Sequence, residues 1–152
     1  MLLDRFAAAF EDGDMTALAA LLRADVALEM PPVATWFSGR ETVLRYLASE
    51  LCTSAGRTRL VPAAANGQPA FAAYVRDDDG VYRAHAMIVL TLTLTGTLIT
   101  RIVIVLEPAL FRLFGLAREL ASGEPRPSGR GASAACACQE MRGFPPVRPG
   151  VG

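Results

Sequence analysis

Apolar residues recur at helical spacing over the first part of the chain. Leu3, Phe6 and Phe10 predict a first helix, which a glycine ends. Asp14 comes next, and its carboxylate can cap a second helix whose apolar face lies within residues 15–22. Two short helices are therefore expected before the spacing changes.

A short strand and a third helix are expected next. Apolar and other residues alternate over 26–30, which predicts a strand that two prolines end. Trp36 and Phe37 then fall in a predicted loop. Ser38 and Glu41 have the S-x-x-E spacing of a capping box, so the third helix is expected to open at Ser38.

The second half of the chain has the period of two that is typical of strands. Asn66-Gly67 is a hairpin turn signal, and a polar turn is expected around residues 77–80. A short helical turn is expected at 110–114. The four predicted strands cover residues 58–65, 69–76, 81–94 and 98–106.

Helices followed by a run of antiparallel strands predict an α+β fold, with a curved sheet and helices packed on one face. Such a sheet leaves a concave mouth, where ligands commonly bind. We expect one domain over residues 1–120. Residues 121–152 are rich in Gly, Pro, Ser and Ala without periodicity, which predicts a disordered tail.

Composition narrows the function classes. The chain has 152 residues, 52% of them apolar, and its fifteen basic residues balance fifteen acidic ones. A balanced charge does not favour direct binding of nucleic acid. Three cysteines and no signal peptide favour a reducing cytoplasm. Segment 86–106 is apolar, but its alternating threonines indicate strands rather than a membrane span.

Several segments in order resemble the SnoaL-like branch of the NTF2-like superfamily. The opening LLDRFAAAFEDGDMTALAALLRADVALEMPP has the helix–GD–helix–strand pattern of that superfamily. The phrases LEMPP, WFSGRE, ANGQPAFAAY and EPALFRLFGL resemble the C-terminal domain of extracytoplasmic-function RNA polymerase sigma factors. The resemblance covers residues 1–120 and implies a cone-shaped fold with a central pocket. It also implies that a homodimer forms through the open face of the sheet.

The sigma factors of this resemblance carry two helical regions, which bind DNA and polymerase, ahead of this domain. Met1 lies almost at the first predicted helix, so we expect both regions to be absent here. The chain is then a fragment, a split gene product or a free-standing relative.

The resemblance also bears on catalysis, because NTF2-like enzymes include ketosteroid isomerases and polyketide cyclases. Such enzymes move a proton with a carboxylate and hold an oxyanion with hydrogen-bond donors. The isomerase base aligns with Met30 and the donor tyrosine with Phe6, and neither residue has the required group. Isomerase chemistry is therefore not expected, and no cofactor is implied.

A cyclase would need an acid or base inside the cone, and Glu29, His85 and Glu107 are the candidates. Glu29 either enters the pocket or faces solvent, and His85 is either a general base or an edge residue without a role. Glu107 is a surface residue or a partner for Arg101. Arg101 either lines the pocket or points outward.

The aromatic residues Trp36 and Phe37 could stack on a ligand, anchor a partner domain or close over the core. The hypothesis of a docking module places the contact surface around Trp36, Phe37, Asn66 and Gln68. Tyr74 belongs either to the pocket or to a cross-strand pair.

Metal sites are not expected. Cys136 and Cys138 are only two thiols, and Cys52 is interpreted as a small core residue. The acidic run 77–79 lacks the full spacing of a calcium loop.

Three functional hypotheses remain from the sequence. The first is a non-enzymatic module that docks on sigma-factor regions, or binds a small molecule, and so tunes transcription initiation. The second is a free-standing SnoaL-like cyclase or isomerase. The third is a binding protein for a small hydrophobic ligand.

Overall fold

The structure, a computed structural model, describes residues 2–31, 35–54 and 56–120. The side chain of Cys52, the other two cysteines and the predicted tail 121–152 lie outside the part that is described, as does the boundary expected at residue 120.

The helices begin and end close to the predicted positions. They are α1 (Leu2–Asp12), α2 (Met15–Leu21), α3 (Arg40–Ser54) and the short α4 (Leu110–Leu113). Asp14 caps α2 as predicted, because its Oδ1 accepts a hydrogen bond of 3.1 Å from the Ala17 amide. The capping box at Ser38 is wrong by one residue, since Ser38 pairs with Ala27 in a sheet and Gly39 directly precedes α3.

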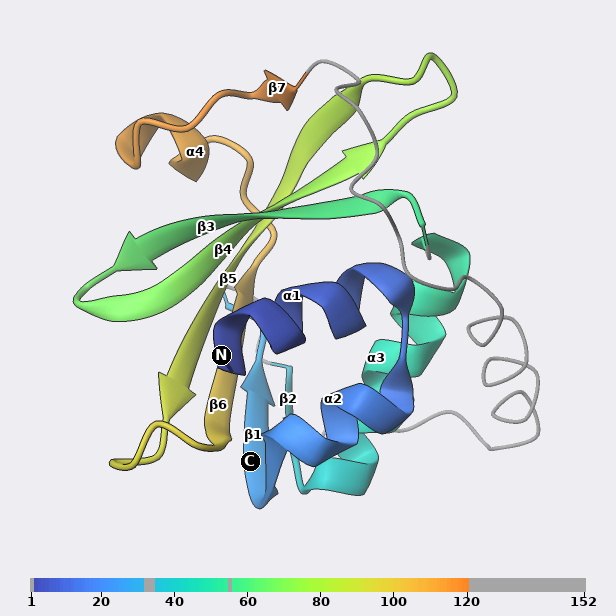
Figure 1. Ribbon diagram of the computed structural model, residues 1–152. Helices are drawn as coiled ribbons and strands as arrows, with labels where there is room; N and C mark the ends of the chain where they lie inside the picture. Colours follow the sequence, from blue (N-terminus) through green and yellow to red (C-terminus); the bar gives the residue numbers. More distant parts are fainter. Residues whose placement is uncertain (1, 32–34, 55, 121–152) are drawn as a thin grey trace.

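One curved sheet contains every strand of the described chain (Figure 1). The order is β2-β1-β6-β5-β4-β3, and β7 pairs with β5 off this path. The hairpin at Asn66-Gly67 forms as predicted, with both residues at positive φ. The strands are β1 (Leu22–Glu29), β2 (Trp36–Ser38), β3 (Thr58–Ala65), β4 (Gln68–Arg76), β5 (Tyr82–Leu92), β6 (Ile99–Val105) and β7 (Glu119–Leu120).

The sheet confirms the α+β class and corrects the strand list in three places. The loop expected around Trp36 and Phe37 is strand β2, which pairs antiparallel with β1. β1 lies parallel to β6, so the sheet is mixed, although β3 to β6 are antiparallel as expected. β7 was not predicted, because two residues carry no detectable alternation.

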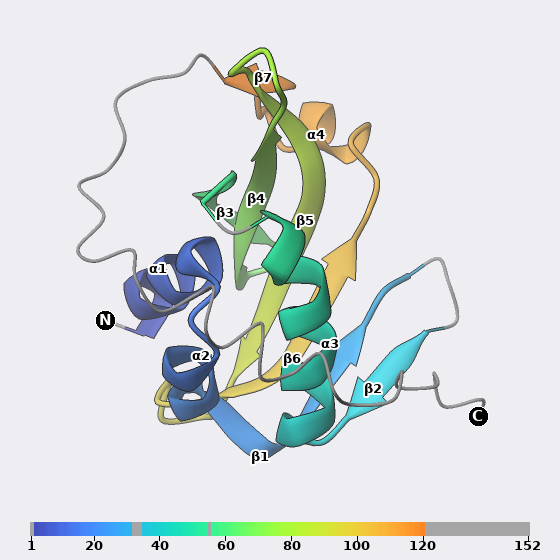
Figure 2. The same cartoon turned by 90° about the vertical axis from the view of Figure 1, so that its right-hand side faces the viewer.

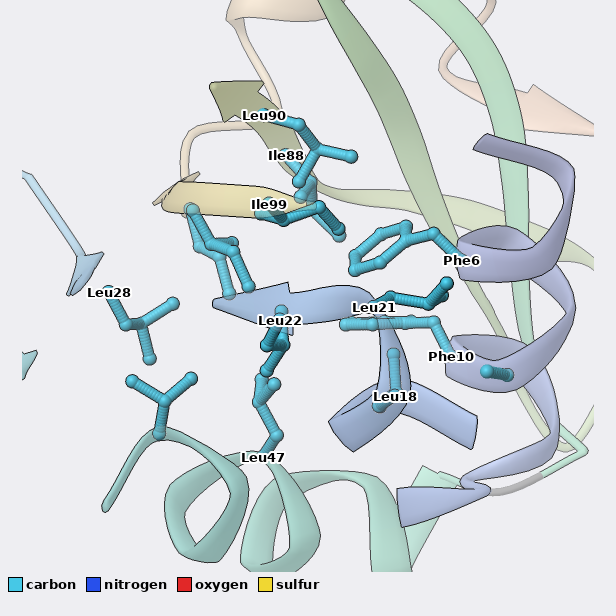
Figure 3. Packing of buried hydrophobic residues seen from close by; sticks show 14 of the residues in the cluster. Phe6, Phe10, Leu18, Leu21, Leu22, Leu28, Leu47, Ile88, Leu90 and Ile99 are labelled. Carbon is cyan, nitrogen blue, oxygen red and sulfur yellow. The ribbon is translucent and has the colours of Figure 1, made fainter. Parts of the chain in front are cut away.

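Helices α1, α2 and α3 cover the inner, concave face of the sheet (Figures 1 and 2). Figure 3 shows the core between them, with Phe6 of α1 directed toward the sheet residues Ile88 and Ile99. Phe6 also stacks on Phe71 of β4 at a ring distance of 5.7 Å. Burial of these apolar side chains fixes the helices on this face.

The outer face of β4 and β5 is covered by residues 110–120, which we name the C-terminal strap. Phe111 is 0% exposed and meets Tyr74 edge-to-face at a ring distance of 5.2 Å. The Tyr74 hydroxyl donates a 2.7 Å hydrogen bond to the Ala117 carbonyl. The Ala84 amide donates to the Arg118 carbonyl, and β7 continues this attachment to β5. The strap therefore closes a second apolar cluster on the outer face.

We predict that Phe111→Ala lowers the free energy of unfolding by about 3–5 kcal/mol, because it removes the ring at the centre of the outer cluster. Leu113→Ala on the same helix is the matched control, since Leu113 is 80% exposed. Its effect should stay within about 0.5 kcal/mol. Urea denaturation of both variants measures the difference, and equal losses would contradict the role of the strap.

Candidate functional site

A pocket of about 790 Å³ lies between α3 and the inner face of β4, β5 and β6; we name it the inner pocket. Its floor is apolar. The residues Ala73 and Ala86 pair across β4 and β5 and contribute only methyl groups, which leaves space at the floor. The buried apolar lining residues are Phe10, Leu47, Leu51, Ala73, Ala86, Ile88 and Ile104.

The mouth of the inner pocket is charged. Arg57 forms an ion pair of 2.8 Å with Asp78, which joins the start of β3 to the turn between β4 and β5. Arg83 forms ion pairs with Asp77 and Asp79, and a longer one of 3.5 Å with Glu119 of the strap. These pairs are exposed to solvent. The acidic run is therefore a solvated turn, as predicted, and its carboxylates are held by arginines.

Hydrogen bonds at this turn shift two pKa values. The bond from Arg83, followed by the bond from the Val81 amide, holds the pKa of Asp79 below its usual value. The bonds to Asp79 and Asp77 raise the pKa of Arg83. Both groups stay charged near neutral pH, so neither is suited to exchange protons with a ligand.

Tyr46 of α3 forms part of the pocket wall. Its ring stacks on Phe37 of β2 at 4.6 Å, which fixes its position. Burial raises the pKa of Tyr46, and the nearby Glu50 carboxylate raises it further. The hydroxyl therefore keeps its proton near neutral pH and can donate a hydrogen bond.

A β-bulge in β5 brings His85 to the pocket mouth. Ala73 pairs with Ala86 while Tyr74 pairs with Ala84, so His85 is an extra residue on β5. Consequently Ala84 faces the outer cluster, and both His85 and Ala86 line the inner pocket. Regular alternation with Met87, which faces the outer cluster, would have directed His85 outward.

The structure brings only two of the predicted site residues into the inner pocket, Met30 and His85. Glu29 forms an ion pair with Arg101 on the exposed side of the sheet, and neither residue lines this pocket. Glu107, expected to be a surface residue or a partner for Arg101, takes the first alternative: it is exposed and accepts a hydrogen bond from the Ala109 amide. Glu29 and Arg101 thus take the solvent-facing alternative.

The aromatic and turn residues that were predicted to line a pocket or a docking surface lie in different parts of the structure. Trp36 is 43% exposed, and Phe37 is buried in the core. Tyr74 belongs to the outer cluster, so it does not line the inner pocket. Gln68 donates a hydrogen bond to the Thr91 hydroxyl, and Asn66 lies in an exposed turn. β2 and β3 are opposite ends of the strand order, so Trp36 and Asn66 do not share the single surface that was expected.

Among the described residues, none at the floor of the pocket is an acid or a base. Met30 lines the pocket and Phe6 is fully buried in the core, so the two positions aligned with isomerase groups carry no proton donor or acceptor. Of the described residues, the carboxylates that line the pocket are Glu50 and Asp77 to Asp79, and all four are exposed at the mouth.

Among the wall and mouth residues that sequence reasoning missed are Tyr46, Arg57 and Arg83. In the sequence, Tyr46 is identifiable only as a residue of the third helix. The one signal for its position is that it lies three residues after the apolar Val43, and so near the buried stripe of that helix. Arg57 and Arg83 are far apart in sequence and meet the acidic turn only in the folded sheet.

Residues 3–102 match the SnoaL-like domain family. The chain belongs to the SnoaL-like domain family. This domain is 35% identical over 116 residues to the ECF RNA polymerase sigma factor SigG of Mycobacterium tuberculosis. The match covers 76% of this SnoaL-like chain and only 30% of the length of the sigma factor.

Solved structures share the fold of this SnoaL-like domain at low sequence identity. A Silicibacter pomeroyi protein with a cystatin-like fold gives a TM-score of 0.56 at 21% identity, covering 75% of this chain and 77% of that one. A Kribbella flavida protein provisionally assigned to the ketosteroid isomerases gives 0.53 at 18% identity, covering 83% and 80%. TerC, co-crystallised with polyporic acid, gives 0.52 at 16% identity, covering 74% and 94%.

Two further features of the described residues bear on the site. No helix among them is long and apolar enough to cross a membrane, and segment 86–106 forms parts of β5 and β6 as its alternation predicted. Within the same residues, no group of three or more His, Cys, Asp or Glu side chains is placed to hold a metal ion.

We predict that Tyr46 ionises at a pH above the usual value for tyrosine, and that Glu50→Gln lowers its pKa part of the way back. Burial, the larger cause, remains in that variant, while the repulsion from Glu50 is lost. Absorbance at the tyrosinate band during a pH titration measures the change, with Tyr46→Phe identifying the transition. An unchanged transition in Glu50→Gln would contradict the placement of Tyr46 beside this carboxylate.

Proposed function

We propose that this SnoaL-like domain is a non-enzymatic regulatory module that binds a small apolar molecule. The observation that carries the proposal is the inner pocket of about 790 Å³, whose buried lining is almost entirely apolar and whose carboxylates are confined to the mouth. Pockets of this size and polarity are typical of small-molecule sites. The described residues at the apolar floor carry no ionisable side chain, so the part of the pocket that would hold the body of the molecule has no group for proton transfer.

The similarity to a sigma factor supports a role in transcription initiation, in the cytoplasm. In this proposal the domain docks on sigma-factor regions, and the bound molecule alters that docking. The exposed Trp36 on the edge strand β2 supports a docking surface there, because aromatic residues at sheet edges often anchor partners. Neither direct contact with nucleic acid nor insertion into a membrane is part of this role.

The pocket is tested with the neutral probe N-phenyl-1-naphthylamine, whose fluorescence rises in apolar surroundings. We expect saturable binding to the protein and at least a tenfold loss in Ala86→Leu, because the larger side chain fills the floor. The control is Ala64→Leu, which adds the same atoms at an exposed position of β3.

Thermal unfolding of both variants shows whether the fold survives the substitution. Absence of saturable binding to the unaltered protein, or equal binding by both variants, would contradict a ligand role for the inner pocket.

Docking is tested by adding sigma-core regions, and the single tryptophan, Trp36, serves as the reporter. We expect complex formation at concentrations of about tens of micromolar or lower, with a blue shift of tryptophan emission as the ring leaves water. Trp36→Ala has no tryptophan, so its binding is measured by isothermal titration calorimetry, and we expect the complex to be weakened about tenfold or more, since truncated aromatic anchors are costly. Leu113→Ala removes an exposed apolar residue on the strap and is the matched control.

No complex at tens of micromolar would contradict docking in this form. A complex unaffected by Trp36→Ala would instead relocate the docking surface away from β2. Neither outcome bears on the ligand pocket, which has its own test.

A free-standing cyclase or isomerase is the second candidate function. It is favoured by one observation, the position of His85 at the pocket mouth, where an imidazole could act as a general base.

A homodimer, which the family resemblance implies, would have to pair through a surface that the strap leaves uncovered, because the strap covers part of the outer face of the sheet.

A further inference from the structure

The sheet of the described chain ends in two edge strands, β2 and β3, and these edges differ in length. β2 has three residues, whereas β3 has eight. A long edge strand presents a row of backbone donors and acceptors to which a strand of another molecule can add. β3 is therefore the edge that offers more backbone to an added strand.

The backbone of β3 alternates between its neighbour β4 and the open side of the sheet. Ala65 and Gln68 pair directly across the two-residue turn, so Ala65 and every second residue before it bond to β4. The Arg76 amide donates a 2.8 Å hydrogen bond to the Arg57 carbonyl, which carries the same alternation to the residue before the strand. The positions whose backbone faces away from β4 are Thr58, Leu60, Pro62 and Ala64.

Glu11 covers one of these outward positions. It lies near the C-terminal end of α1, which runs beside β3 (Figure 2). Its Oε1 accepts a hydrogen bond of 2.7 Å from the Leu60 amide. The Glu11 carbonyl also accepts a bond of 3.2 Å from the Gly56 amide, so the same residue is attached to the chain just before β3. An added strand would have to displace the Glu11 carboxylate before it could use the Leu60 amide.

Pro62 removes the next outward donor, because proline has no amide hydrogen. It pairs with Phe71 in the ladder, and its ring is exposed. Since this position faces away from β4, the proline takes no hydrogen bond from the β3–β4 ladder. Thr58, at the start of the strand, is only 8% exposed. Of the four outward positions, Ala64 is the exposed one that still carries an amide.

From these observations we infer that Glu11 and Pro62 together close the β3 edge to strand addition, and so prevent a second copy of this chain from pairing with it through β3. The two residues act on adjacent outward positions, and an incoming strand needs several such positions in a row. This role is separate from the proposed ligand and docking sites, which lie at the inner pocket and at β2. Strand addition at the opposite end of the sheet is limited to the three residues of β2.

The double variant Glu11→Ala with Pro62→Thr, in the full chain, opens the edge. It frees the Leu60 amide and supplies a new amide at position 62, with a residue that favours strands. Sedimentation velocity over a range of concentrations measures association. We expect the double variant to associate at a concentration at least about tenfold lower than the unaltered protein, because each restored hydrogen bond contributes about fivefold.

Single variants assign the effect to its two residues. Glu11→Gln keeps a side-chain oxygen that can accept from Leu60, so it should behave as the unaltered protein. Pro62→Thr alone removes no hydrogen bond and should increase association about fivefold. It keeps the inference testable even if Glu11→Ala does not fold, which circular dichroism shows.

Two further variants separate edge pairing from a general loss of stability. Asp14→Ala also removes a carboxylate that accepts from a backbone amide, that of Ala17, but at a site away from β3. It should not increase association. Ala64→Pro, added to the double variant, removes the outward amide at position 64 without touching the β3–β4 hydrogen bonds, and it should reverse part of the association.

Hydrogen exchange locates the contact. In the associated double variant, the amides at positions 60, 62 and 64 should exchange more slowly than in its dissociated form. If the double variant associates no more than the unaltered protein, the closing role of Glu11 and Pro62 is overturned. It is also overturned if Asp14→Ala associates equally, or if Ala64→Pro leaves the association unchanged.

Discussion

The pairing of β4 with β5 is the constraint on which the rest of this structure depends. Both strands are buried on two faces, by the helices on the inside and by the strap on the outside. Neighbouring residues of β4 therefore serve different layers, with Ala72 in the outer cluster and Ala73 at the pocket floor. A shift of one residue in this ladder would exchange the two layers, so burial on both faces specifies the register.

The inner pocket follows from this ladder and from the size of its residues. Paired alanines at the floor leave volume that larger apolar side chains would fill, and the bulge directs His85 to the edge of that volume. The strap contacts β5 next to His85, through the Ala84–Arg118 hydrogen bond and the Arg83–Glu119 ion pair. The pocket mouth and the outer face are thus joined through a few residues of β5.

Much of the fold could be predicted from the sequence, because long periodic segments carry their own signal. The cap at Asp14, the Asn66-Gly67 hairpin and the α+β class all depend on local patterns and were confirmed. The site was harder, because its features arise from pairing between distant strands. The bulge at His85 is a property of the β4–β5 register, and the solvent-facing position of Glu29 depends on Arg101, 72 residues away. Tyr74 was ambiguous for the same reason, since its partner Phe111 comes from the strap.

The alanine methyl groups of β4 and β5, which lie on both faces of the sheet, allow the most direct test of the ligand-binding account. Methyl chemical shifts would be recorded by NMR while N-phenyl-1-naphthylamine is titrated into the protein. The account predicts that Ala73 and Ala86 shift at the floor of the inner pocket, and that Ala70 and Ala72 of the outer cluster do not. Shifts confined to Ala70 and Ala72, or no saturable shift at Ala73 and Ala86, would contradict a ligand site on the inner face of the sheet.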